Sequence, residues 1–135
     1  MAEPIHVSAG IIVQNGRVLV CQRRPDQAHG GKWEFPGGKR EAGESIEQCL
    51  RRELHEELGI EAEIGAEVWR TQHSYADREP IALVFLAVPA YRGRLENRVF
   101  ATLRWVEVSE LRELDFLEAD RELIARLATG QIQLR

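Results

Sequence analysis

A helix with a defined start and stop is the feature that most constrains the fold of this chain. Ser45 occupies an N-cap position, Gln48 completes a capping box three residues later, and Gly59 is a natural C-terminal stop. The pattern predicts a helix over residues 46–58. Because its apolar residues fall on one stripe, that face must pack against a core. The stripe consists of Ile46, Cys49, Leu50, Leu54 and Leu58.

A neighbouring stripe of the same helix is acidic at the end where acids are unfavourable. Glu53, Glu56 and Glu57 lie near the C-terminus, where the helix macrodipole is negative and favours Lys or Arg. Spacings of three and four residues also bring these carboxylates close enough to repel each other. One interpretation is a solvated face on which Arg52 bridges to Glu56. The other is a divalent cation site, for which all-oxygen ligands favour Mg²⁺ or Mn²⁺.

Strand signals on both sides of this helix predict a mixed sheet packed between helices. Asn15-Gly16 joins two β-branched runs and predicts a hairpin. Strands are also expected within residues 61–75, 79–91 and 103–108, with a turn at 76–78. The segment 109–130 is helical in composition and is expected to end at Gly130.

Residues 25–39, rich in Gly and Pro, predict a loop that nevertheless carries two large rings. Trp33 and Phe35 either pin this loop in the core or line a site. Cys21 and Cys49 lie among apolar neighbours and are expected to be buried free thiols in a reducing compartment.

Length and charge limit the number of domains and the class of partner. The 135 residues predict a single domain over 1–135. With 18 basic and 22 acidic residues the net charge is -4, which argues against stable nucleic-acid binding and leaves a phosphorylated small molecule possible. The sequence shows neither signal-peptide features nor an apolar run of membrane-spanning length, so we expect a cytoplasmic protein without membrane partners. A monomer and a homodimer are both possible.

Residues 38–60, "GKREAGESIEQCLRRELHEELGI", resemble the Nudix box. Gly38, Glu44 and the run "RELHEELGI" over 52–60 occupy its defined positions. The preceding "KWEFPGGK" is similar to a loop of the MutT-like branch. The resemblance implies the Nudix fold, an α/β/α sandwich with a central mixed sheet. It also implies a hydrolase that uses Mg²⁺, with Mn²⁺ as a substitute, on a nucleoside diphosphate linked to another group.

The resemblance also implies a role for each matching residue. Glu53, Glu56 and Glu57 would bind metal, and a backbone carbonyl at Gly37 or Gly38 would complete the set of ligands. Arg52 would orient the glutamates, and Glu44 would brace the loop by pairing with Arg52. Lys39 lies where the family often meets substrate phosphates, although an exposed loop lysine is the alternative. Gly38, Glu44 and Gly59 would be structural positions of the box.

One position departs from the pattern. Many MutT-like proteins carry a glutamate, acting as base or metal ligand, in the loop before the last strand, and Val99 stands at the aligned position. Glu96 lies three residues earlier and could replace it, although a surface acid is the simpler interpretation. Glu53 or Glu56 is therefore the expected general base.

The resemblance implies a nucleoside triphosphate as substrate, cleaved to the monophosphate and pyrophosphate. Signatures of the branches acting on ADP-ribose or dinucleoside polyphosphates do not fit well. The leading substrate is an oxidised nucleotide such as 8-oxo-dGTP, and the alternatives are CTP or dCTP, or a non-catalytic nucleotide-binding regulator.

The candidate base contacts lie outside the box. They are Arg23 or Arg24, Phe35 and Asp120. Asp120 is expected to face inward with the apolar side of the last helix, and as an ionised acceptor it would suit the donors of guanine, 8-oxoguanine or cytosine. Its alternative role is the N-cap of that helix. His73 and Tyr75 are expected on the sheet surface.

Overall fold

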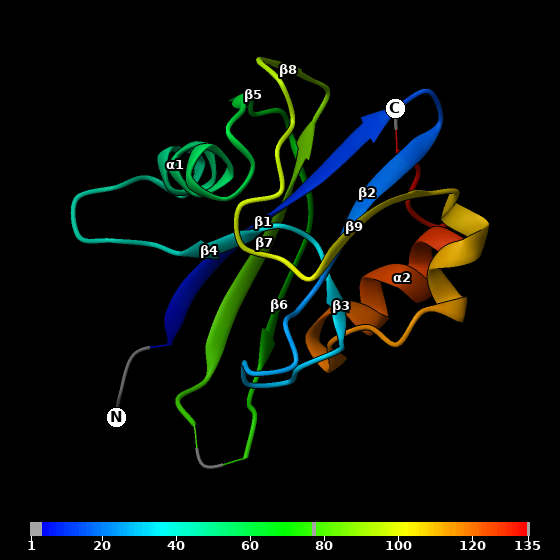
Figure 1. Cartoon of the computed structure of the whole chain (residues 1–135). Coiled ribbons are helices and arrows are strands. Elements are labelled where there is room, and N and C mark those ends of the chain that lie inside the picture. Colours follow the sequence, from blue (N-terminus) through cyan, green and yellow to red (C-terminus); the bar gives the residue numbers. More distant parts are fainter. Residues whose placement is uncertain (1–3, 77, 135) are drawn as a thin grey trace.

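The computed structural model describes residues 4–76 and 78–134, which form three layers (Figure 1). A central sheet lies between α1 (Ile46–Leu58) on one face and α2 (Arg121–Ala128) on the other. The expected arrangement of a mixed sheet between helices is confirmed. Within the described ranges, no helix combines the length and the apolar character needed to cross a membrane.

The long strand β1 (Ile5–Gln14) organises the sheet. It pairs antiparallel with β2 (Arg17–Gln22) and β4 (Gly37–Lys39) and parallel with β7 (Ile81–Val88). The Asn15-Gly16 hairpin between β1 and β2 is confirmed, with φ of 54° and 76° at its two central residues. Positive φ at both positions is the geometry of a type I′ turn, which Asn-Gly favours.

The remaining strands extend the sheet on both sides. β3 (Trp33–Glu34) and β9 (Thr102–Val106) pair with β2, and β6 (Glu67–His73) pairs with β7. A separate antiparallel pair, β5 (Glu61–Glu63) and β8 (Ala90–Arg92), lies beside α1 (Figure 1). The turn expected at 76–78 includes Asp77, which lies outside the described residues.

The hydrophobic core has two halves, one on each face of the sheet. Neighbouring residues of β1 point to opposite faces, so Ile11 packs in the half that contains α2 and Ile12 in the half that contains α1. The predicted apolar stripe of α1 is buried, except that Ile46 is only partly covered. Cys21 and Cys49 are buried free thiols, as expected.

The loop expected at 25–39 contains the two short strands β3 and β4, which the sequence did not predict. Trp33 and Phe35 are both buried. The Phe35 ring lies 6.0 Å from that of Phe85 and 5.2 Å from that of Phe116. These contacts support the interpretation that the two rings pin the segment in the core.

The expectation of a continuous C-terminal helix over 109–130 is wrong. Two 3₁₀ turns, η1 (Val108–Glu113) and η2 (Glu118–Asp120), precede the short α2. Between the turns the chain pairs with Trp33, which donates its backbone N–H to Asp115 and accepts one from Leu117. These tertiary hydrogen bonds override the helical preference of the sequence.

Candidate active site

The predicted ends of the central helix are confirmed in detail. The Ser45 hydroxyl accepts the Gln48 backbone N–H at 3.0 Å, and the Gln48 side chain accepts the Ser45 N–H at 2.9 Å. Gly59 ends the helix in the left-handed conformation, with φ of 72°. Because both ends are fixed, the faces of α1 are fixed relative to the sheet.

The loop after β8 compensates the misplaced acids at the end of α1. The Arg98 guanidinium donates to the carbonyl of His55 at 3.1 Å, and the Arg98 backbone N–H donates to that of Glu57 at 3.1 Å. The Glu96 N–H donates to Leu58 at 2.9 Å. A positive charge thus lies at the negative end of the helix. Sequence reasoning missed Arg98, since it is remote along the chain and no local pattern marks it.

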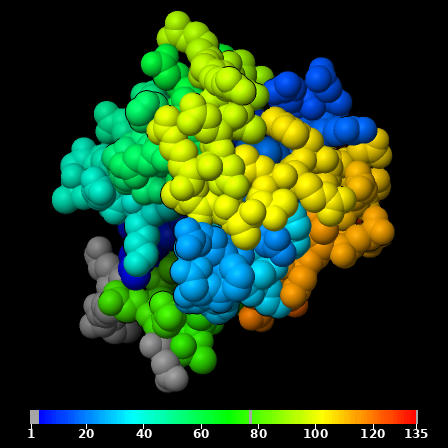
Figure 2. All heavy atoms as spheres, in the orientation of Figure 1, coloured from blue at the N-terminus to red at the C-terminus, as the bar shows by residue number. Residues whose placement is uncertain are grey.

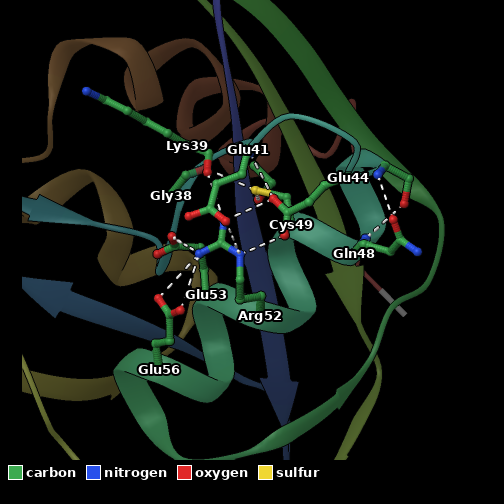
Figure 3. Close-up of polar contacts among 11 residues, drawn as sticks. Gly38, Lys39, Glu41, Glu44, Gln48, Cys49, Arg52, Glu53 and Glu56 are labelled. Atoms are coloured by element: carbon green, nitrogen blue, oxygen red, sulfur yellow. Dashed lines mark hydrogen bonds and ion pairs between the residues drawn. The ribbon is translucent and has the colours of Figure 1, made fainter.

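Arg52 is the centre of the acidic cluster (Figure 3). Its Nε donates to Glu44 at 2.7 Å, and its Nη1 donates to Glu53 at 2.8 Å and to Glu56 at 3.3 Å. Its Nη2 donates to the Lys39 carbonyl at 3.1 Å. The bond to Arg52 lowers the pKa of Glu44 to about 2, and these acids raise the pKa of Arg52. The expected pairing of Glu44 with Arg52 and the contact of Arg52 with two glutamates are both present.

Two glycines bring the backbone of β4 against the carboxylates of α1. A Cβ atom on Gly38 would collide with the Glu53 carboxylate, and one on Gly37 would collide with the Ser8 carbonyl of β1. The Gly37 backbone N–H donates to Glu57 at 3.1 Å. At Gly37 the collision is with backbone, so only glycine fits, whereas a side chain at Gly38 would have to displace the Glu53 carboxylate.

The acids in this space resist ionisation. Burial, together with the charges of Glu53 and Glu34, raises the pKa of Glu57 from 4.5 to about 9. Burial also raises the pKa of Glu53, against the effect of Arg52. The Glu53 side chain is only 17% exposed, which argues against the interpretation of this stripe as a solvated face. The Glu53 carboxylate lies instead against Gly38, which with Gly37 of β4 forms what we call the glycine loop.

Carboxylates that repel each other in a partly buried place have the donor chemistry that suits a hard divalent cation. Within residues 4–76 and 78–134, no three His, Cys, Asp or Glu side chains are already grouped to hold an ion. Glu53 and Glu57 lie together, whereas the Glu56 carboxylate rests on Arg52 and is 56% exposed. The residues therefore fit the expected metal in chemistry, and Glu53, Glu56 and Glu57 are the carboxylates that would hold it.

A cavity of about 530 Å³ begins at the glycine loop and reaches the segment before α2. Four of the predicted substrate contacts line it together: Arg23, Phe35, Lys39 and Asp120. Arg24 is separate from them, because it lies on the exposed β2–β3 loop and pairs with Asp26 at 3.2 Å. A larger cavity of about 900 Å³ lies between α1 and the β5–β8 pair. The glycine loop lines the smaller cavity, which is the candidate nucleotide site, whereas Glu44, Arg52 and Glu56 line the larger one.

Asp120 is buried at this cavity, with 4% of its surface exposed. It occupies the N-cap position of α2 but its side chain makes no capping hydrogen bond. Burial, aided by the charge of Glu34, raises the pKa of Asp120 well above its ordinary value. The inward position agrees with the sequence prediction, but the ionised form assumed there is disfavoured. A neutral acid donates one hydrogen bond and accepts another.

Glu34 is a residue of the site that sequence reasoning missed. It lines the cavity and accepts two hydrogen bonds from Arg23 Nη1, at 3.0 and 3.3 Å. Burial raises the pKa of Glu34 even though Arg23 lowers it. The sequence predicted a loop at this position, so the alternation of Trp33 and Glu34 in strand β3, which turns the carboxylate away from the Trp33 ring, could not be used to find it.

Tyr75 lines the cavity wall, so its expected position on the open sheet surface is wrong. Its hydroxyl accepts the Ala119 backbone N–H at 3.2 Å, and its ring lies 4.9 Å from that of His29 and 4.4 Å from that of His73. Figure 2 shows the β2–β3 loop lying next to the β6–β7 connection, in agreement with these contacts.

The loop that carries Glu96 and Val99 is attached to the end of α1. Val99 is 39% exposed. The Glu96 carboxylate is 53% exposed and pairs with Arg98 at 3.5 Å. That Glu96 does not act as base stays a prediction.

Comparison with known proteins agrees with this geometry. The NUDIX domain family model matches residues 4–127. The chain is 39% identical to the CTP pyrophosphohydrolase of Escherichia coli (strain K12), over 89% of this chain and 88% of that protein. It is 40% identical to the putative 8-oxo-dGTP diphosphatase 2 of Mycobacterium tuberculosis (strain ATCC 25618 / H37Rv), over 90% and 86%.

Two solved structures resemble this chain over nearly its whole length. The solution structure of the E. coli ORF135 protein superposes with a TM-score of 0.85 at 36% identity, covering 96% of this chain and 91% of that one. The MutT NUDIX hydrolase from Burkholderia pseudomallei gives a TM-score of 0.83 at 25% identity, covering 93% and 99%. The α/β/α sandwich is therefore the Nudix fold, and this chain is a hydrolase that belongs to the Nudix family, in its MutT-like branch.

Proposed function

We propose that this protein hydrolyses nucleoside triphosphates to the monophosphate and pyrophosphate in a Mg²⁺-dependent reaction, with 8-oxo-dGTP as the leading substrate. The observation that carries the proposal is the position of one cavity. It begins at the glycine loop that lies on Glu53 and Glu57, and it ends at the buried acid Asp120. A nucleoside triphosphate would fill this cavity with its phosphates at the glycine loop and its base at Asp120.

The acidic end supplies the groups that phosphoanhydride cleavage requires. A bound Mg²⁺ would neutralise phosphate charge and lower the pKa of an attacking water. Glu53, Glu56 and Glu57 would hold it, with a carbonyl of Gly37 or Gly38. Arg52 orients Glu53 by its 2.8 Å bond, and Lys39 is an exposed cation beside the loop, available to a phosphate. Glu53 or Glu56 would accept the proton of the water.

The buried end supplies base recognition. A neutral Asp120 offers one donor and one acceptor, which match O6 and N7–H on the edge of 8-oxoguanine. The same edge of undamaged guanine presents two acceptors, N7 and O6, and leaves the Asp120 acceptor unpaired. Burial of Asp120 makes such an unpaired group costly, which gives the site a means to reject guanine.

Cytosine is the second candidate base, for a specific reason. Its N3 acceptor and N4 amino donor are adjacent and also match a neutral carboxyl group. The 39% identical relative named CTP pyrophosphohydrolase adds support for CTP or dCTP. Asp120 alone therefore does not separate the two candidates.

Release of pyrophosphate from a panel of nucleotides tests the proposal directly. We expect 8-oxo-dGTP, or else dCTP or CTP, to give the highest kcat/KM with Mg²⁺. Excess EDTA should abolish the activity, and Mg²⁺ or Mn²⁺ should restore it. Undiminished activity in EDTA would refute the metal mechanism. Release of orthophosphate, with a nucleoside diphosphate as the other product, would refute the assigned bond.

A further inference from the structure

Beneath the glycine loop lies a buried polar pair that the proposed function does not use. Ser8 is fully buried in β1, and so is Cys49 in α1. The Ser8 hydroxyl oxygen lies 3.2 Å from the Cys49 sulfur. A polar group at this depth is expected to have a partner, and each of these side chains is the partner of the other.

The direction of the hydrogen bonds follows from a third group, the Gly38 carbonyl, which can only accept. The Cys49 thiol donates to the Gly38 carbonyl, with 3.4 Å between sulfur and oxygen. Because a thiol has one proton, its sulfur must accept the hydrogen bond from the Ser8 hydroxyl. The chain of donors thus runs from Ser8 through Cys49 to Gly38, and Figure 3 shows the Cys49 sulfur directed towards Gly38.

The two glycines of this loop also contact the acids of α1. Gly38 has no room for a Cβ beside the Glu53 carboxylate, and the preceding Gly37 donates its N–H to Glu57. Cys49 lies one helical turn before Glu53, so a single helix face supplies both the carboxylate and the thiol that contact Gly38. Ser8 is the residue of β1 directly opposite Gly38 in the β1–β4 ladder.

We propose that Ser8 and Cys49 are positioning residues that fix the Gly38 peptide at the level where Glu53 and Glu57 meet. This inference rests on the proposed function, since it assigns the pair a role in forming the divalent metal site. Loss of the thiol would leave the Gly38 carbonyl without this donor and would let the loop move relative to the glutamates. The base-binding end lies elsewhere in the cavity and should not change.

The test compares Cys49→Ala with Cys49→Ser, because the two variants differ by one hydroxyl that can still donate to Gly38. Mn²⁺ binding without nucleotide is followed by electron paramagnetic resonance. Cys49→Ala should raise the Kd for Mn²⁺ by roughly tenfold, in the range seen when groups supporting a metal ligand are removed, and Cys49→Ser by less than about threefold. With Mg²⁺, kcat should fall in Cys49→Ala while KM for the nucleotide stays near the wild-type value.

A matched control removes one methylene from the other half of the core. Ile124→Val in α2 should lower Tm slightly and leave the Kd for Mn²⁺ unchanged. If Cys49→Ala lowers Tm but binds Mn²⁺ like the wild type, the pair only fills the core and the proposal is overturned. If Cys49→Ala does not fold, Ser8→Ala decides, with an expected rise in Kd of about threefold or more.

Failure of this inference can be distinguished from failure of the proposed function. Wild-type protein that binds Mn²⁺ but cleaves no nucleoside triphosphate would refute the function, while a weaker Kd in Cys49→Ala would still support positioning. Wild-type protein that cleaves substrate, with unchanged Mn²⁺ binding in both Cys49→Ala and Ser8→Ala, would overturn positioning alone. Wild-type protein that binds no Mn²⁺ without nucleotide would also overturn positioning of a metal site, while pyrophosphate release with Mg²⁺ would still support the proposed function.

Discussion

The two ends of the cavity are built in different ways. At the acidic end, the glycine loop lines the cavity, and Glu53 and Glu57, which contact this loop from behind, come from the same continuous stretch, residues 37–57, positioned by a helix with two defined caps. At the base end, Arg23, Glu34, Tyr75 and Asp120 come from separate parts of the chain. The acidic end therefore depends on local structure, whereas the base end exists only when the whole sheet is assembled.

The two ends also differ in how they manage buried charge. Glu53 and Glu57 lie close enough to repel each other, and a bound cation would relieve this repulsion. Asp120 is a single buried acid, and burial raises its pKa, which favours the protonated form. Chemistry that needs negative charge is thus expected at the first end, and discrimination between neutral bases at the second.

The largest expected effect comes from the acidic end. Glu53→Gln should lower kcat by roughly 10²-fold or more, because it removes a carboxylate that would hold the metal or accept a proton. An amide oxygen can still accept from Arg52, so circular dichroism and Tm should stay close to wild type. A loss of Tm as large as that of a core truncation would instead assign Glu53 a structural role.

The next effect should be confined to the base end. Asp120→Ala should lower kcat/KM for the preferred nucleotide by about tenfold or more and should spare poor substrates, because the lost pairing was specific to one base. Asp120→Asn, which keeps a donor and an acceptor, should retain more activity than Asp120→Ala. Kinetics on the nucleotide panel measure both variants. An equal loss for every triphosphate would contradict a role in base selection.

The difference between the two ends also explains what the sequence could predict. The caps of α1, its buried stripe and the Arg52–Glu44 pair follow from spacings of three, four and eight residues, which local rules describe. The Arg98 contact with the helix end, the pairing of Trp33 with residues 115–117 and the place of Tyr75 beside Asp120 depend on tertiary contacts. Periodicity in one segment carries no information about them.

The pH dependence of stability gives a smaller effect at the acidic end. In the folded, metal-free protein the pKa of Glu57 is about 9, above its ordinary value of 4.5. The folded state therefore holds a proton that the unfolded state has released, and stability falls as pH rises through this window. In EDTA at pH 8, Glu57→Gln should raise Tm on the order of 3–5 °C, corresponding to about 1 kcal/mol.

Near and below pH 4.5 the Tm values of wild type and Glu57→Gln should converge, because the unfolded state of the wild type then also holds the proton that the folded state keeps. Adding Mg²⁺ at pH 8 should raise the Tm of the wild type more than that of the variant, since the cation favours the ionised carboxylate. Parallel Tm profiles for the two proteins across this pH range would mean that Glu57 ionises without penalty. The contrast between the two ends would then be lost.

The smallest effect is expected for Glu96, an acid that belongs to neither end of the cavity. Glu96 lies on the loop attached to the end of α1, and its carboxylate is 53% exposed and paired with Arg98. Its backbone N–H, held by the Leu58 carbonyl, keeps its position when the side chain changes. Glu96→Gln should therefore leave kcat within about twofold of wild type, because the exposed ion pair that it removes contributes little to stability. A fall comparable to that of Glu53→Gln would mean that the loop moves towards the glutamates during turnover, so that the acidic end also depends on distant parts of the chain.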